Sequence, residues 1–478
     1  MSDSYWLSRF VFERALAVVY LVAFLCAVNQ FVPLLGSRGL LPAARFVRAV
    51  PFRASPSLFY LSSTDATFAA AAWLGVGLSA LAATGLLERS ALASAGVWTA
   101  LWLLYLSFVN VGQVFYGFGW ESLLLETGFF AIFLGNRATA PSAIVIWILR
   151  WVLFRDMFGA GLIKLRGDPC WRDLTCLNYY FETQPIPNPL SWYFHWLPGG
   201  FHRAGVVFNH VGELAVPFLY FLPQPLAAIG GAVTILFQLT LVVSGNLSWL
   251  NWLTIVLCIP TLDDRWWSWL PVEQPVLQDP MPIQRAAIYA VGALVLVMSV
   301  RPILNILSPQ QLMNYSFNPL HLVNTYGAFG SITRMRTELV IEGTEEDPIA
   351  SSTRWREYEF KGKPGDPSRV PPQVAPYHLR LDWLMWFAAM SRPADHPWFP
   401  MLLVRLLDGD RATLGMLRTN PFPDRPPRYV RALSYSYRFT TLDERRRSGQ
   451  WWNRELIGIY HAPVALRLRD EERTPVLR

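Results

Sequence analysis

Charged side chains are scarce in this chain. Lys, Arg, Asp and Glu make up 16% of its 478 residues, whereas about 25% is typical of soluble proteins. Hydrophobic residues reach 53%, so an ordinary soluble globular protein is excluded for most of the chain. The small charge excess, +7, comes from scattered arginines that form no basic stripe. We therefore expect no nucleic-acid partner and assign the excess to contact with membrane lipids.

The sequence motifs of several enzyme classes are also missing. There is no Walker loop, no GxSxG elbow, no HExxH motif and no dinucleotide-binding glycine fingerprint, which argues against the enzyme classes that those motifs define. Only four cysteines are present, and they suggest no thiol-bound metal. We expect no cofactor and no metal site, and we assign no catalytic residue.

Long apolar runs, by contrast, fill the chain from Phe12 to about Leu307. Helices that are apolar on every side over about 20 residues lie in lipid or inside a membrane bundle. The eighth run is short and could be re-entrant, so eight or nine spans are predicted. The predicted spans are 12–35, 67–87, 91–111, 119–135, 142–165, 204–223, 226–243, 247–260 and 284–306.

Two connections constrain how these spans are arranged. The sixth and seventh spans are joined so tightly, by Pro223-Gln224-Pro225, that they must form a helical hairpin. With a cytoplasmic N-terminus, nine spans place the loops 36–66 and 166–203 on the outer side, together with the C-terminal region. The arginines of loop 36–66 oppose this orientation under the positive-inside rule, unless some of them lie on an interfacial helix.

From about Ser308 the chain becomes polar and alternates with the period of β-strands. Helices are predicted at 379–391 and 397–408. We therefore predict a polytopic α-helical membrane bundle at 1–307, followed by a β-rich α+β soluble domain at 308–478. Alternating strand residues are Met335, Thr337, Leu339 and Ile341; Arg356, Tyr358 and Phe360; Leu433, Tyr435, Tyr437 and Phe439; and Val464, Leu466 and Leu468.

Seven unusual strings occur in order along nearly the whole chain. They are FGWESLLLETG (118–128), GAGLIKLRGDPCWRDLTC (159–176), ETQPIPNP (182–189), VNTYGAFG (323–330), WREYEFK (355–361), PYHLRLDW (376–383) and WWNRELIG (451–458). Together they resemble the lipase maturation factor family. This resemblance implies a membrane protein that helps secreted homodimeric lipases fold and assemble, so lipase-like client proteins are the expected partners. It implies an endoplasmic reticulum membrane address in a eukaryote, or the inner membrane in a bacterium.

A shorter string supports an alternative function. Residues 158–164 are similar to a membrane-helix motif of the vitamin K-dependent carboxylase group, which implies a lysine base at Lys164. The alternative is therefore an integral-membrane enzyme that acts on a lipid or quinone-like molecule. A transporter is a third possibility, but the inverted repeats with broken helices that favour it are not evident.

Ionisable residues inside the predicted spans are candidate site residues. A charge at membrane depth costs about 2.5–3.5 kcal/mol on insertion scales, so it normally pairs or lines a cavity. We expect Glu121 and Glu126 to face the fifth span and neutralise one of its cations; a polar ligand cavity is the alternative. The candidates on the fifth span are Arg150, Arg155, Asp156 and Lys164.

His210 and Glu213 lie three residues apart on the sixth span and therefore share one face. The spacing occurs in carboxylate metal sites, but the order is reversed and no second pair is present. Interhelical hydrogen bonds are the favoured interpretation, as they are for Gln238 and Asn251.

Two further sites lie outside the spans. Cys170 and Cys176 are spaced C-x5-C, which allows a disulfide or two free thiols, but is not the C-x-x-C spacing of thiol oxidoreductases. Trp451 and Trp452, with neighbouring Arg454, follow Gly449 in a predicted connector. They form either a client-contact patch or, as the favoured alternative, part of the core and membrane edge.

Overall fold

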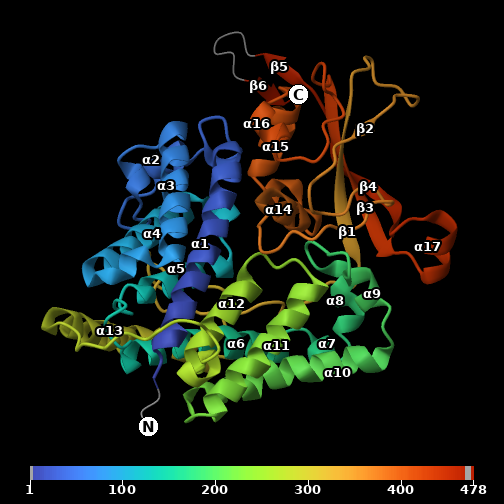
Figure 1. Ribbon diagram of the computed structural model, residues 1–478. Coiled ribbons are helices and arrows are strands. Elements are labelled where there is room, and N and C mark those ends of the chain that lie inside the picture. The colour runs from blue at the N-terminus through green and yellow to red at the C-terminus, as the bar shows by residue number, and fades with distance from the viewer. Residues whose placement is uncertain (1–3, 469–474, 478) are drawn as a thin grey trace.

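The computed structural model describes residues 4–468 and 475–477. It has two regions, a helical bundle and an antiparallel sheet (Figure 1). The helices α14 (Arg380–Ala389) and α15 (Trp398–Leu407) lie between the sheet and helix α1 (Trp6–Leu35). The helical bundle and the sheet region are therefore in extensive contact.

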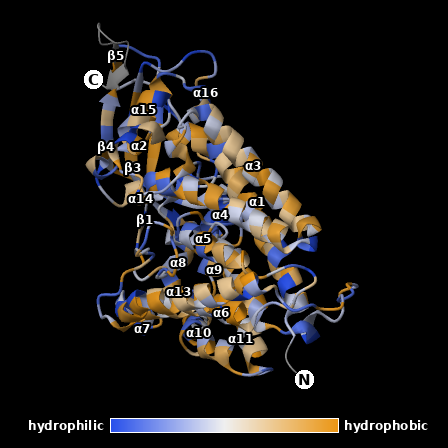
Figure 2. Ribbon diagram, turned by 90° about the vertical axis from the view of Figure 1, so that its left-hand side faces the viewer, coloured by the Kyte–Doolittle hydropathy of each residue, from blue (hydrophilic) through white to orange (hydrophobic). Residues whose placement is uncertain are grey.

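Six helical segments are long and apolar enough to cross a membrane. Their outer surfaces carry apolar side chains, and in α13 Leu296 and Val297 are 76% and 73% exposed, as lipid-facing residues should be. Figure 2 shows the hydrophobic character of α3 and α13. The segments are α1, α3 (Asp65–Thr84), α4 (Ala91–Val111), Gly199–Phe221, α11 (Leu226–Ser244) and α13 (Pro282–Leu307).

The predicted count of eight or nine spans is not confirmed. Helices α5 (Gly119–Ala131) and α12 (Leu250–Cys258) have 13 and 9 residues. At about 1.5 Å per residue, both are shorter than the roughly 30 Å hydrocarbon layer. Helix α6 (Ala143–Arg166) is 24 residues long but carries the charges noted above. All three pack among the six apolar segments, and every residue of α5 except Phe129 is buried.

The predicted helical hairpin is present. Helix α10 (Gly199–His210) continues through a π-helical turn, η4 (Val211–Ala215), and a 3-10 turn, η5 (Val216–Phe221), before α11 returns alongside. The hydroxyls of Tyr220 and Thr234 are 2.6 Å apart across the hairpin. A Cβ at Gly230 would lie 2.9 Å from the Cβ of Leu219, so the close approach of η5 and α11 requires glycine there.

The C-terminal region forms a four-stranded antiparallel sheet in the order β2-β1-β3-β4. The strands are β1 (Arg336–Thr344), β2 (Arg356–Glu357), β3 (Tyr429–Phe439) and β4 (Trp452–Val464). A separate pair, β5 (Leu466–Leu468) and β6 (Pro475–Leu477), follows. Leu339 and Ile341 of β1 are fully buried, and α14 and α15 pack on the sheet.

The sequence predicts most of this region correctly. The strands around 335–341 and 433–439 and both helices are confirmed. The strand predicted over 355–360 is limited to Arg356–Glu357. The connector predicted at Trp451-Trp452 is wrong for Trp452, where strand β4 begins, whereas Trp451 lies just before the strand.

Loop segments from the membrane half complete the sheet region. Arg336 of β1 donates from Nη1 to the carbonyl of Glu182 at 2.8 Å, and from Nη2 to that of Pro185 at 2.9 Å. Trp192 donates to the carbonyl of Thr440 at 2.8 Å. Arg38, just after α1, forms an ion pair with Asp408. The loops 36–66 and 166–203 therefore lie on the same side as the C-terminal region, as predicted.

Candidate functional site

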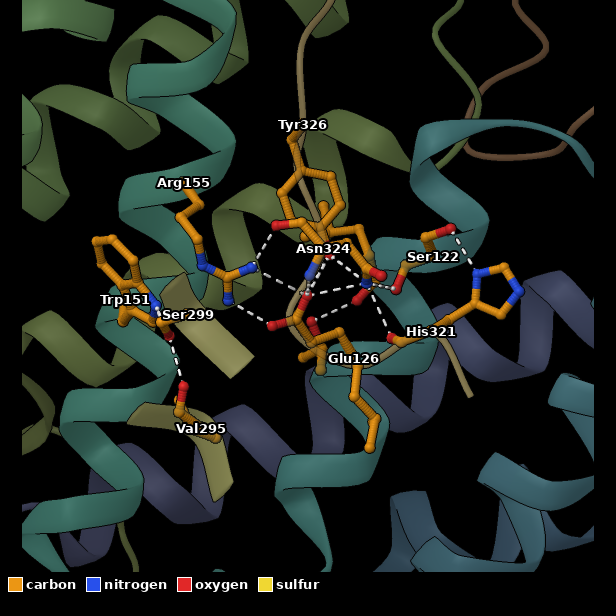
Figure 3. A network of polar contacts seen from close by, with 12 residues as sticks. Ser122, Glu126, Trp151, Arg155, Val295, Ser299, His321, Asn324 and Tyr326 are labelled. Atoms are coloured by element: carbon orange, nitrogen blue, oxygen red, sulfur yellow. Dashed lines mark hydrogen bonds and ion pairs between the residues drawn. The ribbon is translucent and has the colours of Figure 1, made fainter. Parts of the chain in front are cut away.

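The predicted ionisable residues of the helical bundle separate into buried clusters. Three clusters are centred on Glu126, Lys164 and Glu121, and we name them after these residues. Each joins segments that are distant in sequence. Figure 3 shows the Glu126 cluster, in which side chains from α5 and α6 meet the segment that follows α13.

The Glu126 cluster confirms the predicted pairing of α5 with α6. Arg155 and Glu126 form an ion pair whose side chains are 1% and 0% exposed. Tyr326 donates its hydroxyl to Oε2 of Glu126 at 2.6 Å, and Asn324 donates both its backbone N–H and its side-chain amide to the same oxygen, each at 3.0 Å. Arg155 Nη1 also donates to the Asn324 carbonyl at 2.6 Å. The Glu126 carboxylate therefore accepts hydrogen bonds from several donors.

Sequence reasoning missed Asn324 and Tyr326 as site residues, because they lie outside every predicted span. The string VNTYGAFG at 323–330 was the available signal. Nearby, the two ring nitrogens of His321 lie 3.0 Å from Ser122 Oγ and 3.0 Å from Asn110 Oδ1. The segment after α13 therefore forms hydrogen bonds with α4, α5 and α6.

The Lys164 cluster joins α6 to the π-helical turn. The Lys164 ammonium forms an ion pair with Glu213 and donates to Asn209 Oδ1 at 3.0 Å. Asn209 in turn donates to the second carboxylate oxygen of Glu213 at 2.9 Å. The Trp171 ring centroid lies 5.1 Å from the ammonium. These contacts occupy the Lys164 side chain with a carboxylate and an amide, as a structural ion pair in a membrane bundle requires.

His210 does not share this cluster. Its Nε2 lies 2.9 Å from the Trp171 carbonyl, whereas Glu213 pairs with Lys164. In the described part of the chain, no group of three or more His, Cys, Asp or Glu side chains could hold a metal ion. The interhelical interpretation holds for Asn251 and Gln238, whose side chains are joined by a hydrogen bond of 2.7 Å.

Arg150 and Asp156 have other partners. Arg150 donates to the carbonyls of Pro260 and Tyr220, each at 3.0 Å, and to the Tyr5 hydroxyl at 2.7 Å. Asp156 accepts from the Thr254 hydroxyl at 2.8 Å. Both side chains therefore tie α6 to neighbouring segments, and neither belongs to an ion pair between α5 and α6.

The Glu121 cluster corrects the prediction that Glu121 faces α6. Glu121 instead accepts from Arg380 Nη1 at 2.6 Å and from the Tyr105 hydroxyl. Arg380 also donates to the Phe115 carbonyl at 2.7 Å. Because Arg380 opens α14, this ion pair joins the bundle to the sheet region. Burial opposes the guanidinium charge, but Glu121 more than compensates, so the pKa of Arg380 is raised.

His378 lies beside this ion pair and outside the apolar spans. It belongs to the contact between the bundle and the sheet region, which we call the junction. Its Nδ1 is 3.9 Å from Glu121 Oε1, and its side chain is 0% exposed. The aromatic rings of Trp120 and Phe118 lie edge-on to it at 5.0 and 4.9 Å. Burial lowers the pKa of His378 to about 4, although Glu121 pulls it in the opposite direction. His378 is therefore neutral at physiological pH.

Further hydrogen bonds fix the junction. Gln30 of α1 donates to the His378 carbonyl at 2.6 Å and accepts from the Arg380 N–H at 2.9 Å. Asn246 accepts from the N–H of Val374 at 2.7 Å and donates to the Pro372 carbonyl at 2.9 Å. Sequence reasoning missed these residues, because each has its partner more than 100 positions away.

The cysteine loop contains a disulfide. Cys170 and Cys176 are joined, with Cα atoms 4.8 Å apart, and Cys26 and Cys258 are buried and free. Between the joined cysteines, Trp171 donates from Nε1 to the Phe329 carbonyl at 2.9 Å. Of the two alternatives left open by the sequence, the structure has the disulfide.

The predicted client-contact residues lie mainly in the core. Trp452 is 1% exposed, and its ring stacks on Phe439 with centroids 4.1 Å apart. Trp451 is 9% exposed. Arg454 forms an ion pair with Glu357 and is partly buried. This burial favours the core-packing alternative for the two tryptophans.

Comparisons with known proteins agree along the chain. The family model described as "Lipase maturation factor transmembrane domain" matches residues 7–269, and "Lipase maturation factor C-terminal domain" matches residues 322–462. Lipase maturation factor 1 of Bos taurus is 44% identical over 97% of this chain and 90% of its own length. The Homo sapiens protein of that name is 44% identical over 100% and 90%. Lipase maturation factor 2 of Homo sapiens is 30% identical over 96% and 83%. No solved structure matches.

Proposed function

This chain belongs to the lipase maturation factor family, and on that premise we propose that it is a multi-pass membrane factor that helps secreted proteins fold and assemble. Lipases are the proposed clients, following the names of its relatives. The observation that carries the proposal is that the match extends over both the bundle and the sheet region.

The structure supports this function because the sheet region is firmly attached to the helical bundle at the junction. A factor that holds a partly folded chain needs a surface at a fixed position above the membrane. The ion pair of Glu121 with Arg380 is buried on both sides, and Gln30 and Asn246 add hydrogen bonds from two further segments. The sheet region is therefore anchored to the bundle at several separate points.

The disulfide supports a proposal for the side of the membrane on which the sheet region lies. Disulfides persist in oxidising compartments, and the Cys170–Cys176 loop contacts Phe329 near the start of the sheet region. We infer that this side faces the endoplasmic reticulum lumen in a eukaryotic cell, or the outer side of the inner membrane in a bacterium. The N-terminus of α1 then lies on the cytoplasmic side.

No observation favours the alternative of an enzyme with Lys164 as a base. Lys164 is 4% exposed, and its ammonium is occupied by Glu213 and Asn209. The same contacts are what a structural ion pair in a membrane bundle requires.

The test is reconstitution in cells that lack their own lipase maturation activity. A secreted homodimeric lipase is co-expressed with this chain, or with an unrelated multi-pass membrane protein at the same level. We expect the activity per unit of secreted lipase antigen to rise only with this chain. Unchanged specific activity with the chain folded and present would refute the proposal.

A further inference from the structure

Strand β4 is one of the two outer strands of the four-stranded sheet, and one of its edges has no strand beside it. It pairs only with β3. Within the described ranges 4–468 and 475–477, no backbone hydrogen bond joins residues 453–463 to any segment other than β3. The outward main-chain N–H and C=O groups of this stretch therefore lack a backbone partner there.

The side chains along this edge are apolar and exposed. Leu456, Ile457 and Ile459 are 54%, 59% and 67% exposed. Register shifts in the pairing with β3 leave Ile457 without a partner residue, and such bulges re-aim side chains at a sheet edge. Natural proteins usually protect an edge with lysine, proline, inward charges or bulges. Residues 456–460 contain a bulge but no lysine, proline or charge.

The chemistry of the edge indicates whether a lipid surface or another polypeptide would bind there. A lipid surface offers no match for a row of main-chain donors and acceptors, and residues 456–460 carry no cation for a headgroup. Another polypeptide in extended conformation matches both the main chain and the apolar side chains. Glu455, at the start of the apolar run, is exposed and has no ion-pair partner among the described residues, so a basic residue on the occupant would complement it.

We propose that the outer edge of β4, at Leu456, Ile457 and Ile459, binds an extended apolar segment of an incompletely folded secreted client, adding it beside the sheet. This inference rests on the proposed function and names the surface that performs it. In a finished client the same segment is buried, so the client leaves the edge as it folds. The junction holds this edge at a fixed position while the client segment binds and dissociates.

The direct test is site-specific photo-crosslinking in intact cells. A benzoylphenylalanine replaces Ile457, or Met335 as a control, in the full chain co-expressed with the secreted lipase. Met335 is 72% exposed and precedes β1, which lies between β2 and β3 in the order of the strands. We expect a lipase adduct at position 457 only, which mass spectrometry maps to a segment buried in the mature lipase. Equal adducts at both positions, or an adduct only with lipid or with a second copy of this chain, would overturn the inference.

A pair of charge substitutions tests the consequence. Ile457→Lys combined with Ile459→Lys should lower the specific activity of the secreted lipase about tenfold, whereas Met335→Lys should leave it unchanged. Thermal unfolding of both purified variants checks that they fold. If the wild-type chain raises lipase activity and the folded double variant does so equally well, the edge is not the client surface, although the function stands. If the wild-type chain has no effect, the function itself fails.

Discussion

At the scale of single residues, the buried charges of this protein find their partners far along the chain. Glu126 receives hydrogen bonds from Asn324 and Tyr326, about 200 positions away, in addition to its ion pair with Arg155. The sequence predicts that such charges pair, because an unpaired charge in a membrane bundle is costly. It predicts the pair of neighbouring helices, but not Arg380 as the partner of Glu121, because nothing local specifies how the sheet region docks.

Lys164 offers the clearest test between the structural and the enzymatic interpretation. Lys164→Met leaves the Glu213 carboxylate buried without its cation, which should cost about 3–5 kcal/mol of unfolding free energy. Adding Glu213→Gln should restore part of this loss, because the double variant buries no lone charge. Thermal unfolding in detergent measures both. A Lys164→Met protein that is as stable as wild type but inactive would support the enzyme instead.

His378 makes the stability of the junction depend on pH. Its folded-state pKa is about 4, below the roughly 6.5 of an exposed histidine. The unfolded chain therefore binds a proton before the folded chain does, and the stability present above pH 6.5 is lost as the pH falls towards 4. Between pH 7.5 and 5 this one group should cost about 2 kcal/mol.

The measurement is the difference in unfolding free energy between pH 7.5 and pH 5, for wild type and for His378→Phe. Phenylalanine can occupy the same ring cluster without titrating. Other buried groups also titrate; burial raises the pKa of Asp382, for example, and this works in the opposite direction. These contributions are shared by both proteins, so a pH dependence that is identical in the two would show that His378 is not responsible.

At the scale of elements, the periodicity of the sequence predicts the regular helices and strands, but not the short or irregular ones. β1 and β3 were predicted because their side chains alternate cleanly between two faces. β4 was missed because Leu456, Ile457, Ile459 and Tyr460 break the alternation, and the bulges in its pairing explain this irregularity. The span count exceeded the six apolar segments because α5, α6 and α12 are apolar in sequence but short or charged, and they pack inside the bundle.

The disulfide should stabilise the loop between α6 and α8 (Leu177–Thr183). Replacing both Cys170 and Cys176 with Ser removes a cross-link across a sequence separation of 6, and such a short closed loop accounts for about 2 kcal/mol in the chain-entropy model. We expect a lower melting temperature and weaker packing of Trp171, visible in its fluorescence. Cys26→Ser is the matched control, since that thiol is free and buried.

Non-reducing mass spectrometry provides the chemical check on the same loop. The peptide pair that contains Cys170 and Cys176 should be found joined, and alkylation without prior reduction should leave both cysteines unmodified. Alkylation of both in the native membrane would contradict the disulfide, and with it the inferred oxidising side.

At the scale of the whole molecule, the helical bundle and the sheet region are mutually dependent. The predicted boundary at residue 307 follows composition, which changes sharply there. The packing does not follow composition: Arg336 of β1 is bound by loop carbonyls at 182–185, and Arg380 is bound by Glu121. Sequence alone shows where the chain leaves the membrane, but not which earlier loops it returns to.

We therefore predict that residues 308–478 expressed alone do not fold cooperatively. In the full chain, Arg336 and Arg380 are 1% and 0% exposed. The fragment keeps the Glu338 partner of Arg336, but it lacks the loop carbonyls that bind Arg336 and the Glu121 carboxylate that pairs with Arg380. Losing the buried pair of Arg380 with Glu121, together with the packing of α14 against the bundle, costs several kcal/mol, about 3–5 for one broken pair, against a total stability of about 5–15 kcal/mol for a typical domain. Circular dichroism and limited proteolysis should show a broad transition and rapid cleavage, whereas the full chain in lipid nanodiscs should protect the same segment. A sharp two-state melt of the fragment would mean that the sheet region is an independent domain that only rests on the bundle.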